Sequence, residues 1–275
     1  MSKIRIPETE YDKIVDLYKS GLSKEKIEKI YNVSNSVIDR IFRIKNIKCR
    51  DNSHKGRKYY INENYFDKID TPNKAYILGL LYADGCNASN TNLIKLELQE
   101  RDKSILDKIN LELEYSKPLS FHELNRKNSN WQNTYAIEIT NKHMSKKLEE
   151  LGMIPRKSLI LEFPDWINDN LMKDFIRGYF DGDGHIEWNK KHFLTLASSK
   201  EFCEGLQVYL KDKLNIISTN YLTSNKESNT RVLHIFKSKQ IIKVLDWMYK
   251  DSILHIDRKY EKYIGILNIN NSLSA

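Results

Sequence analysis

The sequence lacks the features of a secreted, membrane-spanning or disulfide-bonded protein. Its 275 residues contain only 3 cysteines, Cys49, Cys86 and Cys203, which form no C-x-x-C pair and leave one thiol over. They predict a reducing compartment and no structural zinc. The longest apolar run, residues 75–83, is shorter than the roughly 20 residues that cross a bilayer, and no apolar signal segment follows Met1. We therefore expect a protein of the cytoplasm or nucleoid, without membrane contact.

Motifs for nucleotide chemistry are absent as well. The sequence contains no G-x-x-x-x-G-K-[ST] and no G-x-G-x-x-G, and none of its 7 histidines form a pair at i, i+4 spacing. This excludes a phosphate-binding loop, a dinucleotide site and a helical histidine metal site. We expect no nucleotide cofactor, and we interpret His185, His192 and His234 as surface or DNA-facing groups.

What the chain does have is a basic surplus and enough apolar residues for a core. It carries 45 Lys+Arg against 37 Asp+Glu, which gives a net charge of +8, and it is 40% hydrophobic and 11% aromatic. This composition argues against a disordered or fibrous chain and is enough for one large domain or two smaller ones. The surplus of positive charge predicts a polyanionic partner, most simply nucleic acid.

Residues 1–47 show the pattern of a helix-turn-helix module. A helix over residues 24–31 is followed by a break, and Ser34 is a suitable N-cap for another helix to about residue 45. The second helix carries a polar and basic stripe that fits a major groove. The residues of this stripe are Asn35, Ser36, Asp39, Arg40 and Arg43. The alternative is a small helical bundle with a solvated face.

Residues 48–61 form a basic linker without hydrophobic periodicity, and the rest of the chain repeats one order of elements. We expect a first repeat over residues 62–168 and a second over 169–275, each with helices and alternating strands. Polar strand residues are candidates for contacts with base edges, and the alternative for each is an ordinary solvated sheet face. These candidates are Lys95, Glu97, Gln99 and Arg231.

The strongest signal is a duplicated apolar helix that ends in Asp-Gly, at residues 75–85 and 175–184. In each copy a small residue follows a glycine four places later, so that both lie on one helical face and allow close backbone packing. These pairs are Gly79 with Ala83 and Gly178 with Gly182. Gly85 and Gly184 fit left-handed helix caps. Asp84 and Asp183 then stand at helix C-termini, where the helix dipole disfavours a carboxylate by roughly 0.3–1 kcal/mol.

Parallel packing of the two helices brings both carboxylates together. Like charges at close range resist joint ionisation, and a divalent cation removes that conflict. Carboxylates with water and backbone carbonyls suit Mg²⁺, which positions water and stabilises charge on a phosphodiester. The pattern therefore predicts a metal site made by Asp84 and Asp183 with the preceding residues Ala83 and Gly182. A turn is the alternative for a single Asp-Gly, but two matched copies argue against it.

These two segments resemble the nine-residue motif of the LAGLIDADG homing endonucleases, as ILGLLYADG at residues 77–85 and IRGYFDGDG at 176–184. The second copy has both acids of the motif, Asp181 and Asp183, whereas the first has Tyr82 at the earlier position. The resemblance covers about residues 62–270. It implies an α+β fold of two pseudo-twofold-related α-β-β-α-β-β-α repeats, with antiparallel sheets on DNA and the small all-α module in front. It also implies cleavage of both strands with short 3′ overhangs.

A basic pair late in each repeat supports the alignment. Arg156-Lys157 follows the first acid and Arg258-Lys259 follows the second at nearly the same spacing. In the LAGLIDADG family a basic residue in this part of each repeat contacts the water network or the scissile phosphate. The resemblance therefore implies catalytic roles for Lys157 and Lys259, and an ordinary surface position is the alternative for each.

The leading hypothesis is a monomeric, sequence-specific homing endonuclease of a mobile intron, acting on double-stranded DNA with a long asymmetric target. It would use Mg²⁺, with Mn²⁺ as a substitute. The alternative is a nucleic-acid-binding protein that does not cleave, either a transcription regulator or an intron RNA maturase. An intein is disfavoured because splicing needs a nucleophile at the first residue and an Asn at the last, where Met1 and Ala275 stand.

Overall fold

The computed structural model describes residues 6–20, 22–47, 58–123, 132–154, 160–222 and 229–274. The chain divides into two compact units, residues 1–58 and 59–275, and each unit has a hydrophobic core of its own. None of the described helices is both long and apolar enough to cross a membrane.

In the described part of the smaller unit, three α-helices and a short 3-10 helix surround a core that includes Ile14, Ile27 and Phe42. Asn32 ends the second helix in the left-handed conformation, and residues 32–34 connect it to the third. Ser34 occupies the N-cap, but its hydroxyl bonds the hydroxyl of Ser36 and not a backbone amide. The elements are η1 (Glu8–Glu10), α1 (Tyr11–Lys19), α2 (Lys24–Tyr31) and α3 (Asn35–Ile44).

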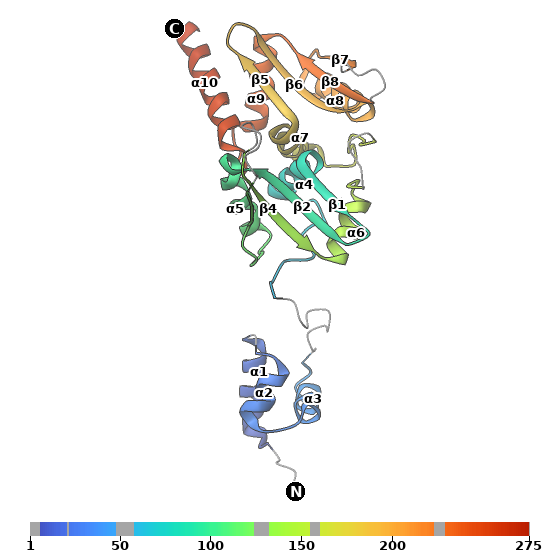
Figure 1. The fold of residues 1–275 in the computed structure, drawn as a ribbon, viewed down its shortest axis with the longest axis vertical. Helices are drawn as coiled ribbons and strands as arrows, with labels where there is room; N and C mark the ends of the chain where they lie inside the picture. Colours follow the sequence, from blue (N-terminus) through green and yellow to red (C-terminus); the bar gives the residue numbers. More distant parts are fainter. Residues whose placement is uncertain are drawn as a thin grey trace. The chain divides into compact units, whose positions relative to one another are not determined.

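The larger unit contains two successive groups of elements in the same order, helix, two strands, helix, two strands, helix (Figure 1). The first repeat consists of α4 (Pro72–Asp84), β1 (Gly85–Ala88), β2 (Leu93–Gln99), η3 (Glu100–Asp102), α5 (Lys103–Glu112), β3 (Ser120–His122), β4 (Thr134–Thr140) and α6 (Lys142–Glu150). The second consists of α7 (Asp169–Asp183), β5 (Gly184–Trp188), β6 (His192–Ser199), α8 (Lys200–Leu214), β7 (Thr219–Leu222), β8 (Thr230–Ile235) and α9 (Ser238–Tyr249), and α10 (Asp257–Ser274) follows it. The expected order of each repeat is confirmed.

Each repeat forms one antiparallel four-stranded sheet, in the order β1-β2-β4-β3 or β5-β6-β8-β7. The register also repeats, because Gly85 pairs with Leu96 in the first sheet and Gly184 pairs with Leu196 in the second. Helices α4, α5 and α6 pack on the first sheet, and α7, α8 and α9 pack on the second. In β2, β6 and β8 the buried apolar residues alternate with less buried ones, as a strand with one helix-covered face requires.

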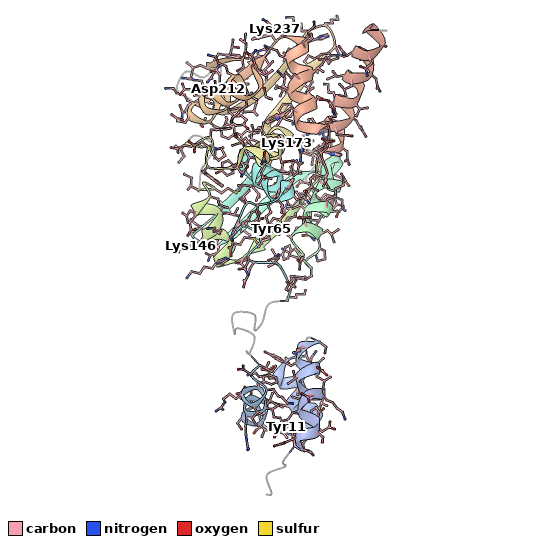
Figure 2. The ribbon with its side chains drawn as sticks, turned by 180° about the vertical axis from the view of Figure 1, so that it is seen from behind. Tyr11, Tyr65, Lys146, Lys173, Asp212 and Lys237 are labelled. Carbon is pink, nitrogen blue, oxygen red and sulfur yellow. The ribbon has the colours of Figure 1, made fainter. Side chains whose placement is uncertain are left out.

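Helices α4 and α7 lie next to each other between the two sheets (Figure 1). In the view from behind, Tyr65 lies on the first-repeat side of α7, whose Lys173 is labelled, and Lys237 lies on the second-repeat side (Figure 2). Thr71 caps α4 by accepting a hydrogen bond from the amide of Lys74 at 3.3 Å, and Asn168 caps α7 through the amide of Asn170 at 2.9 Å. The two motif helices therefore form the centre of the larger unit.

The expectation that Gly85 and Gly184 form left-handed helix caps is wrong. Gly85 has φ −79° and ψ 154°, and Gly184 has φ −88° and ψ 152°, so both are extended and each helix continues directly into a strand. Glycine is required at both positions because neighbouring atoms leave no room for a Cβ. A Cβ on Gly85 would lie 2.5 Å from the carbonyl oxygen of Leu81, and one on Gly184 would lie 2.1 Å from the ring of Phe180.

Candidate active site

The two motif helices pack through reciprocal backbone contacts. A Cβ on Gly79 would lie 2.0 Å from the carbonyl oxygen of Phe175, and one on Gly178 would lie 2.0 Å from that of Tyr76. Equivalent residues thus contact each other in both directions, which is the pattern of a twofold-related interface. The predicted packing along the small faces is confirmed, and only glycine fits at either position.

The same packing brings the acidic ends of the helices together. A Cβ on Gly182 would lie 2.3 Å from the Cβ of Ala83 and 2.7 Å from Oδ2 of Asp84. The Asp84 carboxylate therefore lies against the residue that precedes Asp183. Both aspartates are exposed, although the rest of each helix end is largely buried. Two carboxylates thus reach the solvent at the C-termini of two adjacent parallel helices.

The composition of this site fits a hard divalent cation. No group of three or more His, Cys, Asp or Glu side chains in the described part of the chain is placed to hold a metal ion. Ala83 and Gly182 belong to the last turns of α4 and α7, and the last carbonyls of a helix lie outside its internal hydrogen-bond pattern. Two carboxylates, nearby carbonyls and water match the oxygen ligands that Mg²⁺ prefers.

Lys259, in the first turn of α10, lies beneath this end of α7. Its side chain is buried, and the ammonium donates hydrogen bonds to the carbonyls of Phe180 and, at 2.7 Å, Gly184. Burial lowers the pKa of Lys259 to about 8, although the negative charges of Asp181, Asp84 and Asp183 act to raise it. The ammonium therefore binds one carbonyl in the last turn of α7 and the carbonyl of its C-cap, Gly184, and it lies close enough to both exposed acids to interact with them.

The other basic residues late in the repeats are placed differently. Arg258 forms an ion pair with the buried Asp102, with Nε 3.0 Å from Oδ1. Lys157 and Arg156 lie outside the described residues.

Asp181 is buried and holds α7 to three other segments. It accepts hydrogen bonds from the hydroxyls of Tyr76 and Tyr249 and from the amide of Ile256 at 2.8 Å. Burial raises its pKa, and the charge of Lys259 and the tyrosine hydroxyls oppose that shift. Asp181, the earlier acid of the second motif copy, is thus a structural residue that connects α7 to α4, α9 and the segment before α10.

The sequence reasoning missed the buried ionic residues behind Asp181. Arg177 forms a 2.8 Å ion pair with Asp174 and donates to the carbonyls of Leu254 and Met248 at 2.9 and 2.8 Å. Its guanidinium also lies 5.1 Å from the ring centroid of Tyr76. The sequence carried a signal for them, because residues 174, 177 and 181 recur at helical spacing within the otherwise apolar segment 174–182.

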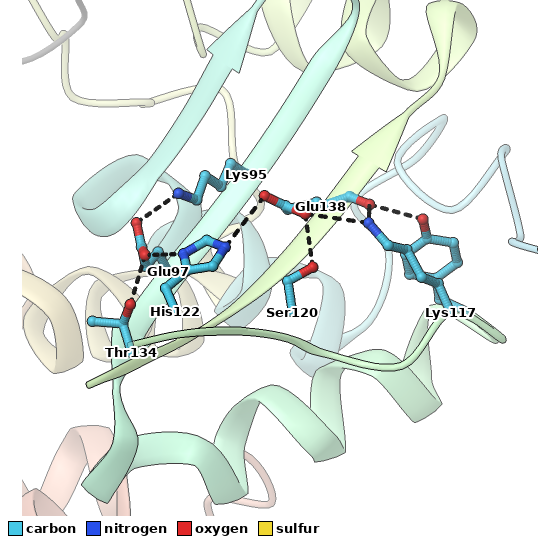
Figure 3. A network of polar contacts seen from close by, with 8 residues as sticks. Lys95, Glu97, Lys117, Ser120, His122, Thr134 and Glu138 are labelled. Atoms are coloured by element: carbon cyan, nitrogen blue, oxygen red, sulfur yellow. Dashed lines mark hydrogen bonds and ion pairs between the residues drawn. The ribbon is translucent and has the colours of Figure 1, made fainter. Parts of the chain in front are cut away.

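On the first sheet, the predicted polar residues lie on the face opposite the helices. We call this the charged face, defined by Lys95, Glu97, Gln99, Ser120, His122 and Glu138. Glu97 lies 2.8 Å from Lys95, 2.7 Å from Nδ1 of His122 and 2.6 Å from the hydroxyl of Thr134 (Figure 3). Partial burial disfavours ionisation of Glu97, but these partners outweigh it and lower the pKa to about 2.

Glu138 completes this network on the neighbouring strand. Its carboxylate accepts hydrogen bonds from Ser120 at 2.7 Å and Lys117 at 3.2 Å and lies 3.8 Å from Nε2 of His122 (Figure 3). The hydrogen bond from Ser120 is the largest cause of its lowered pKa. The charged face therefore presents acids and bases that are already paired with each other.

Arg231 does not share the outer face of the second sheet. It pairs with the buried Ser198 and alternates with Leu233 and Ile235, so its side chain starts from the helix-covered side. Its Nη1 is buried without a hydrogen-bond partner. The expectation that Arg231 lies on an open strand face is therefore corrected, because the strand alternates in the opposite phase.

In the smaller unit, the polar stripe of α3 is on the surface. Asn35, Ser36, Arg40 and Arg43 are exposed. Asp39 differs, because it forms an ion pair with Lys24 at the start of α2 and so connects the two helices.

Comparisons with known proteins bear on this architecture. Residues 170–247 match the family model of the LAGLIDADG-like domain. The matched region runs from α7 into α9, within the second repeat. The resemblance inferred from the second acidic motif is thereby confirmed, and α7, with Asp181 and Asp183, lies at the start of the matched region.

The curated relatives include three proteins of Methanocaldococcus jannaschii. The chain is 26% identical over 151 residues to DNA-directed RNA polymerase subunit Rpo1C, covering 55% of this chain and 17% of the relative. It is 23% identical over 271 residues to a glutamine–fructose-6-phosphate aminotransferase, covering 96% and 22%, and 30% identical over 135 residues to a probable translation initiation factor IF-2, covering 49% and 11%. The chain thus spans less than a quarter of the length of each of these relatives.

Solved structures similar to this chain include LAGLIDADG proteins. The I-LtrWI LAGLIDADG homing endonuclease bound to target DNA matches with a TM-score of 0.49 and 13% identity, covering 78% of this chain and 92% of that one. The N-terminal LAGLIDADG domain of DUF199/WhiA matches with a TM-score of 0.44 and 19% identity, covering 68% and 88%.

Proposed function

We propose that the chain is a metal-dependent, sequence-specific endonuclease of double-stranded DNA. The observation that carries the proposal is the meeting of two exposed carboxylates, Asp84 and Asp183, at the ends of two helices packed through glycine. The helix dipole disfavours an acid at this end, so neither residue is explained by helix stability. A surplus of basic residues over acidic ones supports a polyanionic substrate.

In this mechanism, Asp84 and Asp183 would hold a divalent metal ion, with Mg²⁺ as the ion and Mn²⁺ as a substitute. Bound metal would activate water and stabilise negative charge on the phosphodiester. Ala83 and Gly182 keep the two helix ends close because larger side chains would separate them. Lys259 fixes the last turn of α7 through two carbonyls and places a positive charge beneath the acids. We assign the corresponding role in the first repeat to Lys157.

The sheets would supply the contacts with DNA. The paired carboxylates of Glu97 and Glu138 accept hydrogen bonds, as the exocyclic amino group of cytosine requires, and Lys95 and Gln99 add donors. The exposed stripe of α3 in the smaller unit would enter a separate major groove. We propose that this helix-turn-helix unit adds affinity and specificity to a long asymmetric target bound by one monomer.

The test is cleavage of a duplex library by wild type, Asp84→Asn and Asp183→Asn, each with Mg²⁺ and with EDTA. We expect wild type to cut one site with metal, and each Asn variant to lose at least about 100-fold in rate while still binding the site. Asp212→Asn is the matched control, because this aspartate is exposed on α8. If wild type binds DNA but never cuts it with any divalent metal, the proposal is wrong.

In that outcome the chain would be a binding protein that does not cleave. Competition between duplex DNA and intron RNA would then separate a transcription regulator from an RNA maturase. The role of the smaller unit is tested by removing residues 1–58, since residues 59–275 have their own core. We expect weaker binding and a shallower salt dependence, because the exposed Arg40 and Arg43 are lost. Unchanged specificity and salt dependence would contradict it.

The mobile-intron assignment belongs to the same proposal. The segments similar to this chain occupy 17%, 22% and 11% of three relatives whose names describe unrelated functions. A module that moves between genes is expected to occur in such unrelated contexts.

A further inference from the structure

The outer face of the second sheet carries a continuous group of aromatic rings. We call it the aromatic face, defined by His185, Phe193, Tyr221, His234 and Phe236. The ring of His234 lies 3.7 Å from Phe236, 5.1 Å from Phe193 and 6.0 Å from Tyr221, centroid to centroid. Phe236 and Tyr221 are 53% and 45% exposed. Large apolar side chains at the surface of a sheet call for a partner.

The same register positions in the first sheet are not aromatic. His234 is paired with Thr195, whereas the corresponding pair in the first sheet is Glu138 with Lys95. His185 corresponds in the same way to Cys86. The two outer faces therefore share a backbone geometry but offer different chemistry, ionic on one and aromatic on the other.

The aromatic face is also uncharged at its centre. Burial lowers the pKa of His234, so the neutral ring predominates at pH 7, and its Nε2 is buried without a hydrogen-bond partner. Glu187 lies at the end of β5 next to this face, and its carboxylate accepts hydrogen bonds from the amides of Trp188 and Asn189 at the turn. The centre of the aromatic face therefore has little to offer to hydrogen-bonding base edges.

Unpaired bases are the part of a nucleic acid that fits this surface. In a duplex the flat faces of the bases are stacked inside and only their edges reach the grooves, whereas unpaired bases expose faces that stack on aromatic rings. Lys190 and Lys191, exposed in the turn before β6, supply cations for the phosphates of such a strand. His185 stands two residues after Asp183, so the face is continuous with the candidate metal site.

We propose that the second sheet binds unpaired bases of the DNA substrate by stacking them on Phe193, His234 and Phe236. The inference rests on the proposed endonuclease function for the choice of DNA. It assigns different tasks to the two repeats: the first sheet contacts base edges of paired DNA, and the second holds a segment whose bases have left the stack.

The test is binding measured by fluorescence anisotropy in EDTA, so that cleavage plays no part. The probes are one labelled sequence as duplex, as duplex with a central unpaired bubble, as single-stranded DNA and as single-stranded RNA. Phe236→Ala and Tyr221→Ala remove exposed rings from the aromatic face. Phe121→Ala is the matched control, since this ring is 48% exposed on β3 of the first sheet. Circular dichroism and size-exclusion chromatography check that each variant is folded and unchanged in oligomeric state.

We expect Phe236→Ala to weaken binding of the bubble and the single-stranded DNA by about 5- to 100-fold and to leave duplex binding unchanged, because stacking acts only on unpaired bases. Tyr221→Ala should have a smaller effect in the same direction, and Phe121→Ala none. Equal losses for duplex and unpaired probes, no loss at all, tighter binding of RNA than of DNA, or a changed oligomeric state would each overturn the proposal. Metal-dependent cleavage by wild type in the same preparation would show that the endonuclease function stands even then.

Discussion

The two repeats share one backbone plan but distribute polar groups in opposite ways. Along the motif helices, three positions that are apolar or aromatic in the first repeat are ionisable in the second. They are Ala75, Leu78 and Tyr82 in α4, and Asp174, Arg177 and Asp181 in α7. On the outer faces of the sheets the relation is reversed, since the first repeat is charged and the second is aromatic.

The difference separates what the architecture requires from what each half can vary. Both helices keep a glycine at the crossing and an aspartate at the end, because the close approach and the paired carboxylates need them. The side chains on the other faces of the helices can vary, because their role is to bind each helix to neighbouring segments. In α4 the hydroxyl of Tyr82 donates to the carbonyl of Leu151, whereas in α7 Asp181 accepts three hydrogen bonds.

The largest change in stability should come from the residues that bind the two motif helices to neighbouring segments, Asp181 in α7 and Tyr82 in α4. Asp181→Ala leaves two tyrosine hydroxyls and the Ile256 amide unpaired and removes a negative charge near buried Lys259, so we expect a loss of about 3–5 kcal/mol in the free energy of unfolding. Tyr82→Phe, at the equivalent position, removes one hydrogen bond and should cost about 1 kcal/mol. Urea unfolding measures both. Equal losses would mean that the buried network of α7 adds nothing to its anchoring.

Substitutions of the glycines where α4 and α7 cross test the close packing that both repeats share. Gly79→Ala and Gly178→Ala each place a methyl group 2.0 Å from a carbonyl oxygen of the other helix, and each should cost about 1–3 kcal/mol or more. The two losses should be similar because the contacts are reciprocal. Gly265→Ala in α10 is the control, since no atom lies within 4 Å of the added methyl group, and it should stabilise the protein slightly. Tolerance of either motif variant would contradict reciprocal packing.

The sequence was most informative where local spacing determines packing. A glycine followed four residues later by a small residue predicts the helix contact directly, because both lie on one face, and the terminal aspartates follow from it. The buried position of Lys259 was not predictable, since its partners are carbonyls of Phe180 and Gly184, far away in sequence. The same holds for Asp181, whose partners come from residues 76, 249 and 256.

Sheet faces were less predictable than helix faces. A short strand with polar residues in both phases does not reveal which phase faces the helices, and for Arg231 the pairing with buried Ser198 decides it. For Lys95 and Glu97 the alternation with Ile94, Leu96 and Leu98 was complete enough to fix the face from the sequence. Glycine at residues 85 and 184 was read as a backbone requirement, whereas the structure shows a lack of space.

A smaller effect should separate the two sheet faces by their response to acid. The pKa of Glu97 is about 2 in the folded protein, below its ordinary value of 4.5, so its contribution to stability is complete above pH 4.5 and is lost as the pH falls toward 2. Because about a third of this side chain is exposed, we expect that contribution to be below about 1 kcal/mol. Glu97→Gln should flatten the acid limb of the unfolding free energy, with Glu149→Gln, exposed on α6, as the control.

The smallest effect belongs to the aromatic face, and its pH range is different. Burial lowers the pKa of His234 from 6.5, so the unfolded chain binds the proton more tightly and the contribution of His234 to stability is lost as the pH falls below 6.5. Because burial is the one cause of this shift and no charged partner adds to it, we expect the loss to be smaller than that of Glu97. His234→Leu should make the unfolding free energy less dependent on pH below 6.5 than in wild type, while leaving the loss caused by protonation of Glu97 unchanged.

His255, whose pKa burial also lowers, titrates in the same range in both proteins and cancels in this difference. A variant that instead became less stable at every pH by the same amount would show that His234 acts through packing against Phe193 and Phe236 alone. The two outer faces would then differ in composition but not in how protons affect them, and the contrast between an ionic and an aromatic half would rest on binding measurements.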